Sequence, residues 1–297
     1  MRLFSTISTS IFMSKCLIFS AFFIYLWLPL NAFADNLTTD KPRLLVLTDI
    51  GGDPDDIQSL RRLLVYSNEF NIEGLIASST GSVPSVNEQL ILNAINDYEQ
   101  VRKNLMLHSP GYPTADELRA VVSKGQVSRG YDNLFPGLST PGSQHIIDVV
   151  DASDRLLNIT IWGGAHDLAQ ALLDIVSTRS AEEVEEFTSK IRVYAIADQD
   201  LVFTESTKGT GEWIRENLPN IIYIESGPPW RSIGSASFRG MYQNDSRGGG
   251  HPSLTLTKPG LELLNDENWV KSNVLAWGPI GAGYPVTNQN PNSERNT

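Results

Sequence analysis

Four aspartates lie close together in a loop between an apolar segment and a helical pattern. The stretch from Thr48 to Asp56 reads TDIGGDPDD and carries carboxylates at Asp49, Asp53, Asp55 and Asp56. Carboxylates this close repel one another unless a proton or a cation separates them. A hard cation such as Ca²⁺ takes about 6–8 oxygen ligands, so such a loop can supply several of them. The alternative is that Asp53 and Asp55 cap the following helix and Asp49 forms a turn.

Alternating apolar strands and amphipathic helices must position this loop. Strands are expected at residues 43–48, 72–78, 105–108, 158–162, 191–196 and 221–224, and helices at 57–66, 86–102, 146–151 and 168–176. This alternation predicts an α/β fold of three layers, with a mainly parallel sheet and helices on both faces. Such sheets bind ligands at the carboxyl ends of their strands, where the loop 48–56 and the polar segments 163–167 and 198–200 fall.

The first 34 residues have the pattern of a secretory signal, with Arg2, Lys15, an apolar run over 16–30 and an A-x-A site ending at Ala34. We expect cleavage after Ala34, one domain over 35–285 and a polar tail over 286–297. The protein is then secreted or periplasmic, without a stable membrane anchor. Cleavage removes two basic residues and shifts the net charge from −11 to −13. Because phosphate binding needs a basic face, the composition excludes a nucleic-acid partner.

The acidic loop resembles the D-x-D-P-G-x-D-D signature of nucleoside hydrolases. Residues 48–81 are more similar to the nucleoside-hydrolase-like domain of a family of bacterial cellulose-binding proteins, as are IWGGAHDLAQAL (161–172), KIRVYAIADQD (190–200) and WGPIGAGYP (277–285). The resemblance covers nearly the whole chain after the signal. It implies a nucleoside-hydrolase-like fold and hydrolysis of an N-glycosyl (ribosyl) bond. It also implies a bound Ca²⁺ that orients the ribose hydroxyls and the attacking water.

The resemblance assigns roles to the aspartates of the loop. Asp49 takes the proton of the water and contacts the metal, and Asp56 is the main metal carboxylate. Asp55 contacts the ribose or the metal, and Asp53 is a further candidate metal ligand. Cleavage of an N-glycosyl bond passes through an oxocarbenium-like state, so a base beside the water and negative charge near the sugar suit this chemistry.

Two further segments align with ligand-binding turns of the family. A metal-binding backbone carbonyl falls on His166, and Asp167 replaces a polar neighbour that contacts substrate. Ser82 stands where the family has an asparagine that contacts ribose. The alternatives are that His166 is a packed or loop histidine and that Asp167 caps a helix starting at Leu168.

The sequence departs from the family pattern at two places. If Asp49 is aligned with the second aspartate of the signature, Leu47 occupies the position of the first aspartate and the loop is two residues longer than in the family. An alignment without a gap instead places Asp49 on the first aspartate and Gly51 at the position of the catalytic base. The resembling domains continue beyond the segment 277–285 into an acidic motif that supplies a C-terminal carboxylate. We therefore expect either an incomplete metal site or one closed by another group. His251 is a candidate for that group, although a surface loop is its alternative role.

Three functions remain open on the sequence: the hydrolase, a carbohydrate (cellulose)-binding or catalytically degenerate module that keeps the fold, and a Ca²⁺-stabilised structural protein. The partner is a small ribosyl or other sugar, or a polysaccharide. Tryptophans outside the signal favour the binding module if they are exposed in a row: Trp162, Trp213, Trp230, Trp269 and Trp277. Core packing is expected for Trp162, and structural roles in a loop are expected for Asp198 and Asp200.

Overall fold

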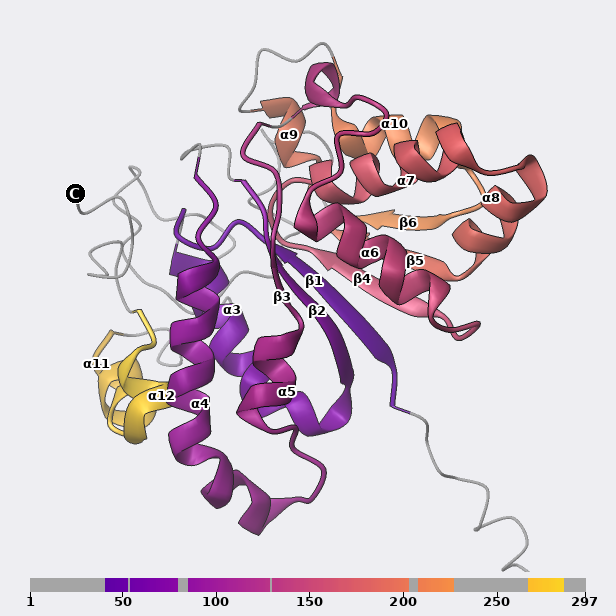
Figure 1. Ribbon diagram of the computed structural model, residues 1–297. Helices are drawn as coiled ribbons and strands as arrows, with labels where there is room; N and C mark the ends of the chain where they lie inside the picture. Colours follow the sequence, from indigo (N-terminus) through magenta and orange to yellow (C-terminus); the bar gives the residue numbers. More distant parts are fainter. Residues whose placement is uncertain are drawn as a thin grey trace, which may run out of the picture. The chain divides into compact units, whose positions relative to one another are not determined.

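The fold of the computed structural model contains one six-stranded sheet in the order β3-β2-β1-β4-β5-β6 (Figure 1). The structure describes residues 41–52, 54–79, 85–128, 130–202, 208–226 and 267–285. The strands are β1 (Arg43–Thr48), β2 (Asn71–Ala77), β3 (Val122–Lys124), β4 (Leu157–Ile161), β5 (Ile191–Ala195) and β6 (Ile222–Glu225). All five pairings are parallel, as the sequence predicts. The order of the strands reverses between β1 and β4, and this is where open α/β sheets bind ligands.

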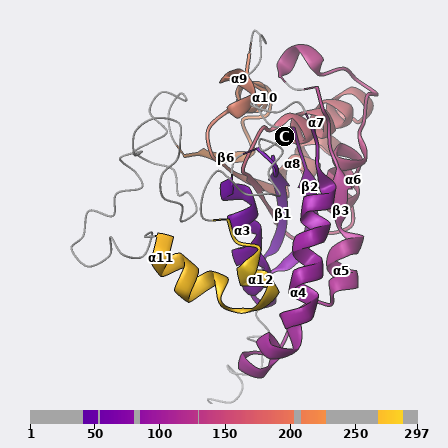
Figure 2. The ribbon, with the colours of Figure 1, turned by 90° about the vertical axis from the view of Figure 1, so that its left-hand side faces the viewer.

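Helices cover both faces of the sheet, as the predicted three-layer α/β fold requires (Figures 1 and 2). One face packs against α3 (Pro54–Val65), α4 (Glu88–His108) and α5 (Ala115–Ala120), and the other against α6 (Pro141–Asp151), α7 (His166–Thr178), α8 (Ala181–Ser189) and α10 (Thr210–Asn217). Alternate residues of β1 serve the two cores. Leu45 and Leu47 join the α6–α7 core, whereas Leu44 and Val46 join the α3–α4 core.

The remaining elements in the described part of the chain are short. They are α9 (Gln199–Val202), α11 (Glu267–Val270), a π-helical turn (Lys271–Leu275), α12 (Gly278–Ala282) and two 3₁₀ turns (Ser67–Glu69 and Tyr131–Asn133). None of the described helices combines the length and the apolar composition needed to cross a bilayer. The sheet belongs to the unit that begins at Pro42.

The strand expected at residues 105–108 is wrong, because α4 continues to His108. Met106 and Leu107 are exposed there, so the apolar residues of this segment do not mark a buried strand. The third strand is instead β3, which follows α5 within a region that the sequence analysis left without elements. A capping box between Thr114 and Glu117 starts α5. With three residues, β3 is too short to show periodicity.

Several predicted features lie outside the described residues. They are the signal over residues 1–34, the tail over 286–297, and Asp53, Ser82, Trp230 and His251. Among the other tryptophans, Trp213 is buried in the α6–α7 core and Trp162 packs against the α3–α4 core, as predicted for Trp162. Trp277 is exposed. The described tryptophans therefore do not form an exposed aromatic row.

Candidate functional site

A pair of buried carboxylates lies where β1 ends. Asp49 follows the last residue of β1, Asp56 lies in the first turn of α3, and they are 7% and 5% exposed. The Thr48 hydroxyl donates a short hydrogen bond to Asp56 Oδ1. Burial raises the pKa of Asp56 well above its usual range, and the charges of Asp49 and Asp55 raise it further. The pair therefore favours a shared proton or a bound cation over two free negative charges.

The turn between β1 and α3 brings these carboxylates together. Gly51 has φ 104°, in the left-handed region where a side chain is disfavoured, and the Gly52 amide donates to the Asp49 carbonyl at 3.2 Å. Because α3 begins at Pro54, Asp55 and Asp56 both lie in its first turn, where the helix dipole stabilises negative charge. Asp55 is half-buried beside the pair.

The WGG turn after β4 packs directly on this pair. A Cβ added to Gly163 would lie 2.6 Å from both Cβ and Cγ of Asp49, so only glycine fits at this distance. A Cβ on Gly164 would lie 2.0 Å from Asp200 Oδ1. The loop 48–56, the turn 163–167 and the segment 198–200 therefore meet at the carboxyl edge of the sheet. This convergence confirms the arrangement predicted from the strand ends.

His166 begins α7 and is buried, at 2% exposed. Neither of its ring nitrogens has a hydrogen-bond partner within the described part of the chain. Burial lowers the pKa of His166 to about 4, and the nearby Gly130 backbone opposes this shift. The ring is therefore neutral at physiological pH, with one nitrogen a donor and the other an acceptor. Metal binding by the His166 carbonyl stays a prediction.

Asp167 links three segments of the chain. Its Oδ1 accepts hydrogen bonds from the Gln126 amide and from Thr140 Oγ1, both at 2.9 Å. Burial raises the pKa of Asp167 to about 7, although these two hydrogen bonds lower it. Since α7 begins at His166 with Ala165 as its N-cap residue, Asp167 is not the cap of this helix, and that alternative is wrong. Contact of Asp167 with substrate stays a prediction.

Asp198 and Asp200 have structural partners, as expected for this loop. The Asp198 carboxylate accepts from the backbone amides of Gly211 at 3.2 Å and Glu212 at 2.6 Å, and so holds the start of α10. Burial raises the pKa of Asp198. Asp200 accepts a short hydrogen bond from the Thr210 hydroxyl. Both aspartates fix α10 beside the WGG turn.

Thr48, Ser78 and Gly163 also belong to this site, although no role in it was predicted for them. Ser78 follows β2, its amide donates to the Thr48 carbonyl at 2.8 Å, and its buried Oγ has no partner among the described residues. A signal for Thr48 and Ser78 was present, because both are small polar residues at the ends of buried strands. The need for glycine at position 163 is visible only once two distant segments are in contact.

The residues at the end of β1 meet part of what the expected Ca²⁺ would need. Two adjacent buried carboxylates suit a divalent cation, and among the described residues the nearby Ser78 Oγ and His166 ring nitrogens have no hydrogen-bond partner. Within the residues that the structure describes, no three His, Cys, Asp or Glu side chains converge as a metal site. Asp49 and Asp56 therefore fit part of a metal site.

A parallel sheet whose strand order reverses beside an acidic loop defines a doubly wound α/β protein with a ligand site at the switch point. Residues 43–292 match the family described as cellulose-binding Sde182, nucleoside hydrolase-like domain, and the chain belongs to this family.

A solved structure supports this assignment. It is a nucleoside hydrolase-related hypothetical protein from Saccharophagus degradans that is associated with carbohydrate metabolism. The two share 30% sequence identity with a TM-score of 0.66, and the match covers 85% of this chain and 54% of that one. The chain thus spans about half the length of this relative. No curated protein matches the sequence.

Proposed function

We propose that the chain binds a carbohydrate at the buried pair of Asp49 and Asp56. The observation that carries this proposal is the position of the pair at the switch point between β1 and β4, the usual ligand site of such sheets. Carboxylates suit a sugar because they accept hydrogen bonds from neighbouring hydroxyls. The cellulose-binding description of the family and the association of the relative with carbohydrate metabolism support this ligand class.

Ca²⁺ is part of the proposal. Asp49 and Asp56 are the carboxylates that would hold it, and Ca²⁺, when bound, would offset their charge and attract sugar hydroxyls. The hydroxyl of Thr48 orients Asp56 through its hydrogen bond to Oδ1. Gly163 allows the turn after β4 to approach Asp49, because a Cβ at this position would lie 2.6 Å from Cβ and Cγ of Asp49.

Hydrolysis of an N-glycosyl bond is the second candidate function, and the buried position of Asp49 favours it. Asp49 would accept a proton from water while the water oxygen bonds to the anomeric carbon. The C–N bond breaks with its electron pair leaving on nitrogen, and the departing base takes up a proton. The negative charge near the sugar ring would stabilise the oxocarbenium-like state.

A calorimetric titration of the protein with Ca²⁺, alone and with ribose or cellobiose, tests the proposal. We expect Ca²⁺ to bind with micromolar affinity and a sugar to strengthen this binding. Asp56→Asn should weaken the affinity for Ca²⁺ by at least about 100-fold, because losing a direct metal ligand costs more than losing a residue that only contacts a ligand. The matched control is Asp154→Asn, which changes an aspartate that is 97% exposed. Sugar binding that survives Asp49→Asn and Asp56→Asn would place the sugar elsewhere and overturn the proposal.

A screen of purine and pyrimidine nucleosides tests the second candidate. Release of free base by the unmodified protein should fall by about 10²–10⁴-fold in Asp49→Asn, the usual contribution of a general base. Sugar binding without release of base from any nucleoside would leave carbohydrate binding as the function and reject hydrolysis.

We also infer that the protein is exported. The charged and apolar pattern of residues 1–34 and its A-x-A site support this inference, as does the cellulose-binding description of the family. Mass spectrometry of protein recovered outside the cytoplasm should give an N-terminus at Asp35. Recovery of the protein only from the cytoplasm, with residues 1–34 still attached, would reject the inference that it is exported.

A further inference from the structure

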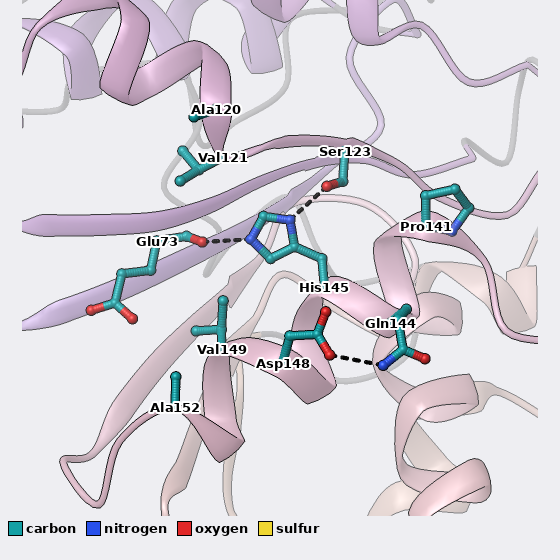
Figure 3. A pocket seen from close by; sticks show the side chains of 10 residues that line it. All are labelled: Glu73, Ala120, Val121, Ser123, Pro141, Gln144, His145, Asp148, Val149 and Ala152. Carbon is teal, nitrogen blue, oxygen red and sulfur yellow. Dashed lines mark hydrogen bonds between the residues drawn. The ribbon is translucent and has the colours of Figure 1, made fainter.

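A second polar site lies on another part of the domain, in a pocket of about 560 Å³ between β3, the end of α5 and α6 (Figure 3). Its walls are partly apolar, with Ala120 and Val121 on one side and Val149 and Ala152 on the other. Ser123 and His145 point toward each other between these walls. Neither residue belongs to the acidic site at the end of β1.

The hydrogen bonds of His145 fix its tautomer. Its Nε2 lies 2.8 Å from the backbone oxygen of Glu73, and its Nδ1 lies 2.6 Å from Ser123 Oγ. Because a carbonyl oxygen only accepts hydrogen bonds, Nε2 must carry the proton. In the neutral ring Nδ1 is then the acceptor, and the Ser123 hydroxyl donates to it. This geometry is that of a serine nucleophile, an adjacent base and a third group that orients the base.

Regular elements hold all three groups. Ser123 lies in β3 opposite Ile76 of β2, so the sheet ladder fixes its position. Glu73 is also in β2, and its carboxylate forms an ion pair with the buried Arg43 at 2.7 Å. A capping box between Thr140 and Ser143 fixes the start of the helix that carries His145. The dyad is therefore built on rigid elements.

We propose that Ser123 and His145 form a second hydrolytic site that cleaves small esters. Ser123 Oγ attacks the acyl carbon and transfers its proton to His145 Nδ1. The ester C–O bond breaks, and the leaving alkoxide takes that proton and departs as an alcohol. Water then gives a proton to His145 and attacks the acyl-serine, which releases the carboxylic acid and restores the Ser123 hydroxyl.

The lining of the pocket indicates the class of ester. Its charged side chains are Glu73, which is paired with Arg43, and Asp148, which accepts a hydrogen bond from Gln144 Nε2 at 2.8 Å. No lysine or arginine is among the residues that line it. An anionic ester would meet repulsion there, whereas a short acyl chain on an uncharged alcohol fits the apolar walls.

Hydrolysis of p-nitrophenyl acetate by the full chain, with labelling by a fluorophosphonate, tests this site. Ser123→Ala should abolish labelling, and His145→Gln should slow hydrolysis by about 10²–10⁴-fold. The matched controls are Ser177→Ala, whose exposed hydroxyl donates to the Leu173 carbonyl, and His108→Gln at the exposed end of α4. If Ser123→Ala hydrolyses the ester and is labelled as well as the unmodified protein, the proposal is overturned. It is also overturned if the unmodified protein shows neither hydrolysis nor labelling.

A thiol in place of the hydroxyl gives a readout that does not depend on turnover. In the full chain carrying Cys16→Ser, Ser123→Cys introduces a single thiol beside His145. We expect rapid alkylation by iodoacetamide below pH 7, because a neighbouring imidazole stabilises the thiolate. Adding His145→Gln should move the alkylation profile to the ordinary thiol pKa of about 8.5. The same profile with and without His145 would show that the two residues do not form a nucleophile and base.

Discussion

The Asp167 carboxyl illustrates how burial at a single residue ties stability to pH. Its raised pKa of about 7 means that the folded protein holds a proton that the unfolded chain loses near pH 3.8. The contribution of this carboxyl to the free energy of unfolding is therefore fully present below about pH 3.8 and decreases as the pH rises to about 7. Asn cannot titrate and can keep an oxygen toward Gln126 and Thr140. The variant Asp167→Asn should therefore gain stability relative to the native protein as the pH rises.

Since one unit of pKa is worth about 1.36 kcal/mol, the gain at pH 8 should approach about 4 kcal/mol as an upper limit. Urea unfolding of both proteins at pH 4, 6 and 8 measures it. Asp154→Asn serves as the control, because that carboxylate is exposed and should give no such trend. If the difference in unfolding free energy between Asp167→Asn and the native protein does not change with pH, the buried carboxyl does not titrate in this range.

Gly163 tests the packing of the acidic pair. In Gly163→Ala the new Cβ would meet Asp49 at 2.6 Å, and overpacking of this kind costs about 1–3 kcal/mol. We expect lower stability together with weaker Ca²⁺ binding, measured by urea unfolding and calorimetry. Gly137→Ala is an instructive comparison, because Gly137 has φ 82° and open space around it, so its cost is backbone strain alone. Unchanged Ca²⁺ binding in Gly163→Ala would show that Asp49 does not bind the metal.

At the residue scale, the sequence predicted candidates better than it predicted contacts. Asp49 and Asp56 were identified because they follow a buried strand and start a helix, and both of these facts are local. The roles of Asp167 and Gly163 depend on segments far away in the chain, such as the Gln126 amide and the end of β1. No pattern within the WGGAHD segment contains that information.

At the scale of elements, a buried arginine joins the neighbouring strands β1 and β2 to α6. Arg43 of β1 donates to Glu73 of β2 and to the backbone oxygens of Arg155 and Val149, and it is 2% exposed. Glu73→Ala would leave this guanidinium without its counter-charge, so we expect a loss of about 3 kcal/mol, measured by urea unfolding.

The control for this ion pair is Asp151→Ala, which removes the partner of Arg179 on the surface. Both members of that pair are substantially exposed, so the loss should stay within about 1 kcal/mol. Equal losses in the two variants would contradict a special role for the buried arginine.

Element prediction succeeded where burial and apolar character coincide. Residues 43–48 form β1 as predicted, since every one of them is buried. The sequence missed α5 and β3, which are short, and it ended α4 early because the apolar residues near its end face solvent. At the end of α4 apolar character and burial disagree, so a rule that infers burial from apolar character fails there.

At the scale of the whole domain, the two halves of the sheet are covered unequally within the described residues. The face that packs against α3 and α4 continues across β5 and β6 through Tyr194, Ile222 and Ile224, which are 44%, 53% and 51% exposed. The sequence predicted both strands but not this asymmetry. Which helix covers which strand depends on how the chain connects distant elements, and local sequence patterns do not contain that information.

Arg61 of α3 is one of the residues that hold the last described helix, α12, to the domain. Arg61 of α3 donates to the carbonyls of Pro279 at 3.2 Å and Ile280 at 2.9 Å, and it pairs with Asp97 of α4 at 2.7 Å. In Arg61→Ala these carbonyls and the Asp97 carboxylate lose a charged donor, so we expect a loss of about 2–4 kcal/mol. Hydrogen exchange should also accelerate at the amides of Gly283 and Tyr284 as α12 detaches.

The comparison variant is Arg119→Ala, which removes an arginine whose partners Glu99 and Asp116 are exposed. It should cost no more than about 1 kcal/mol and leave exchange near α12 unchanged. Faster exchange throughout the domain in Arg61→Ala would mean that α12 and the sheet unfold as one unit. Faster exchange confined to residues 278–285 would show that α12 is a separately stabilised part of the domain, attached through α3 and α4.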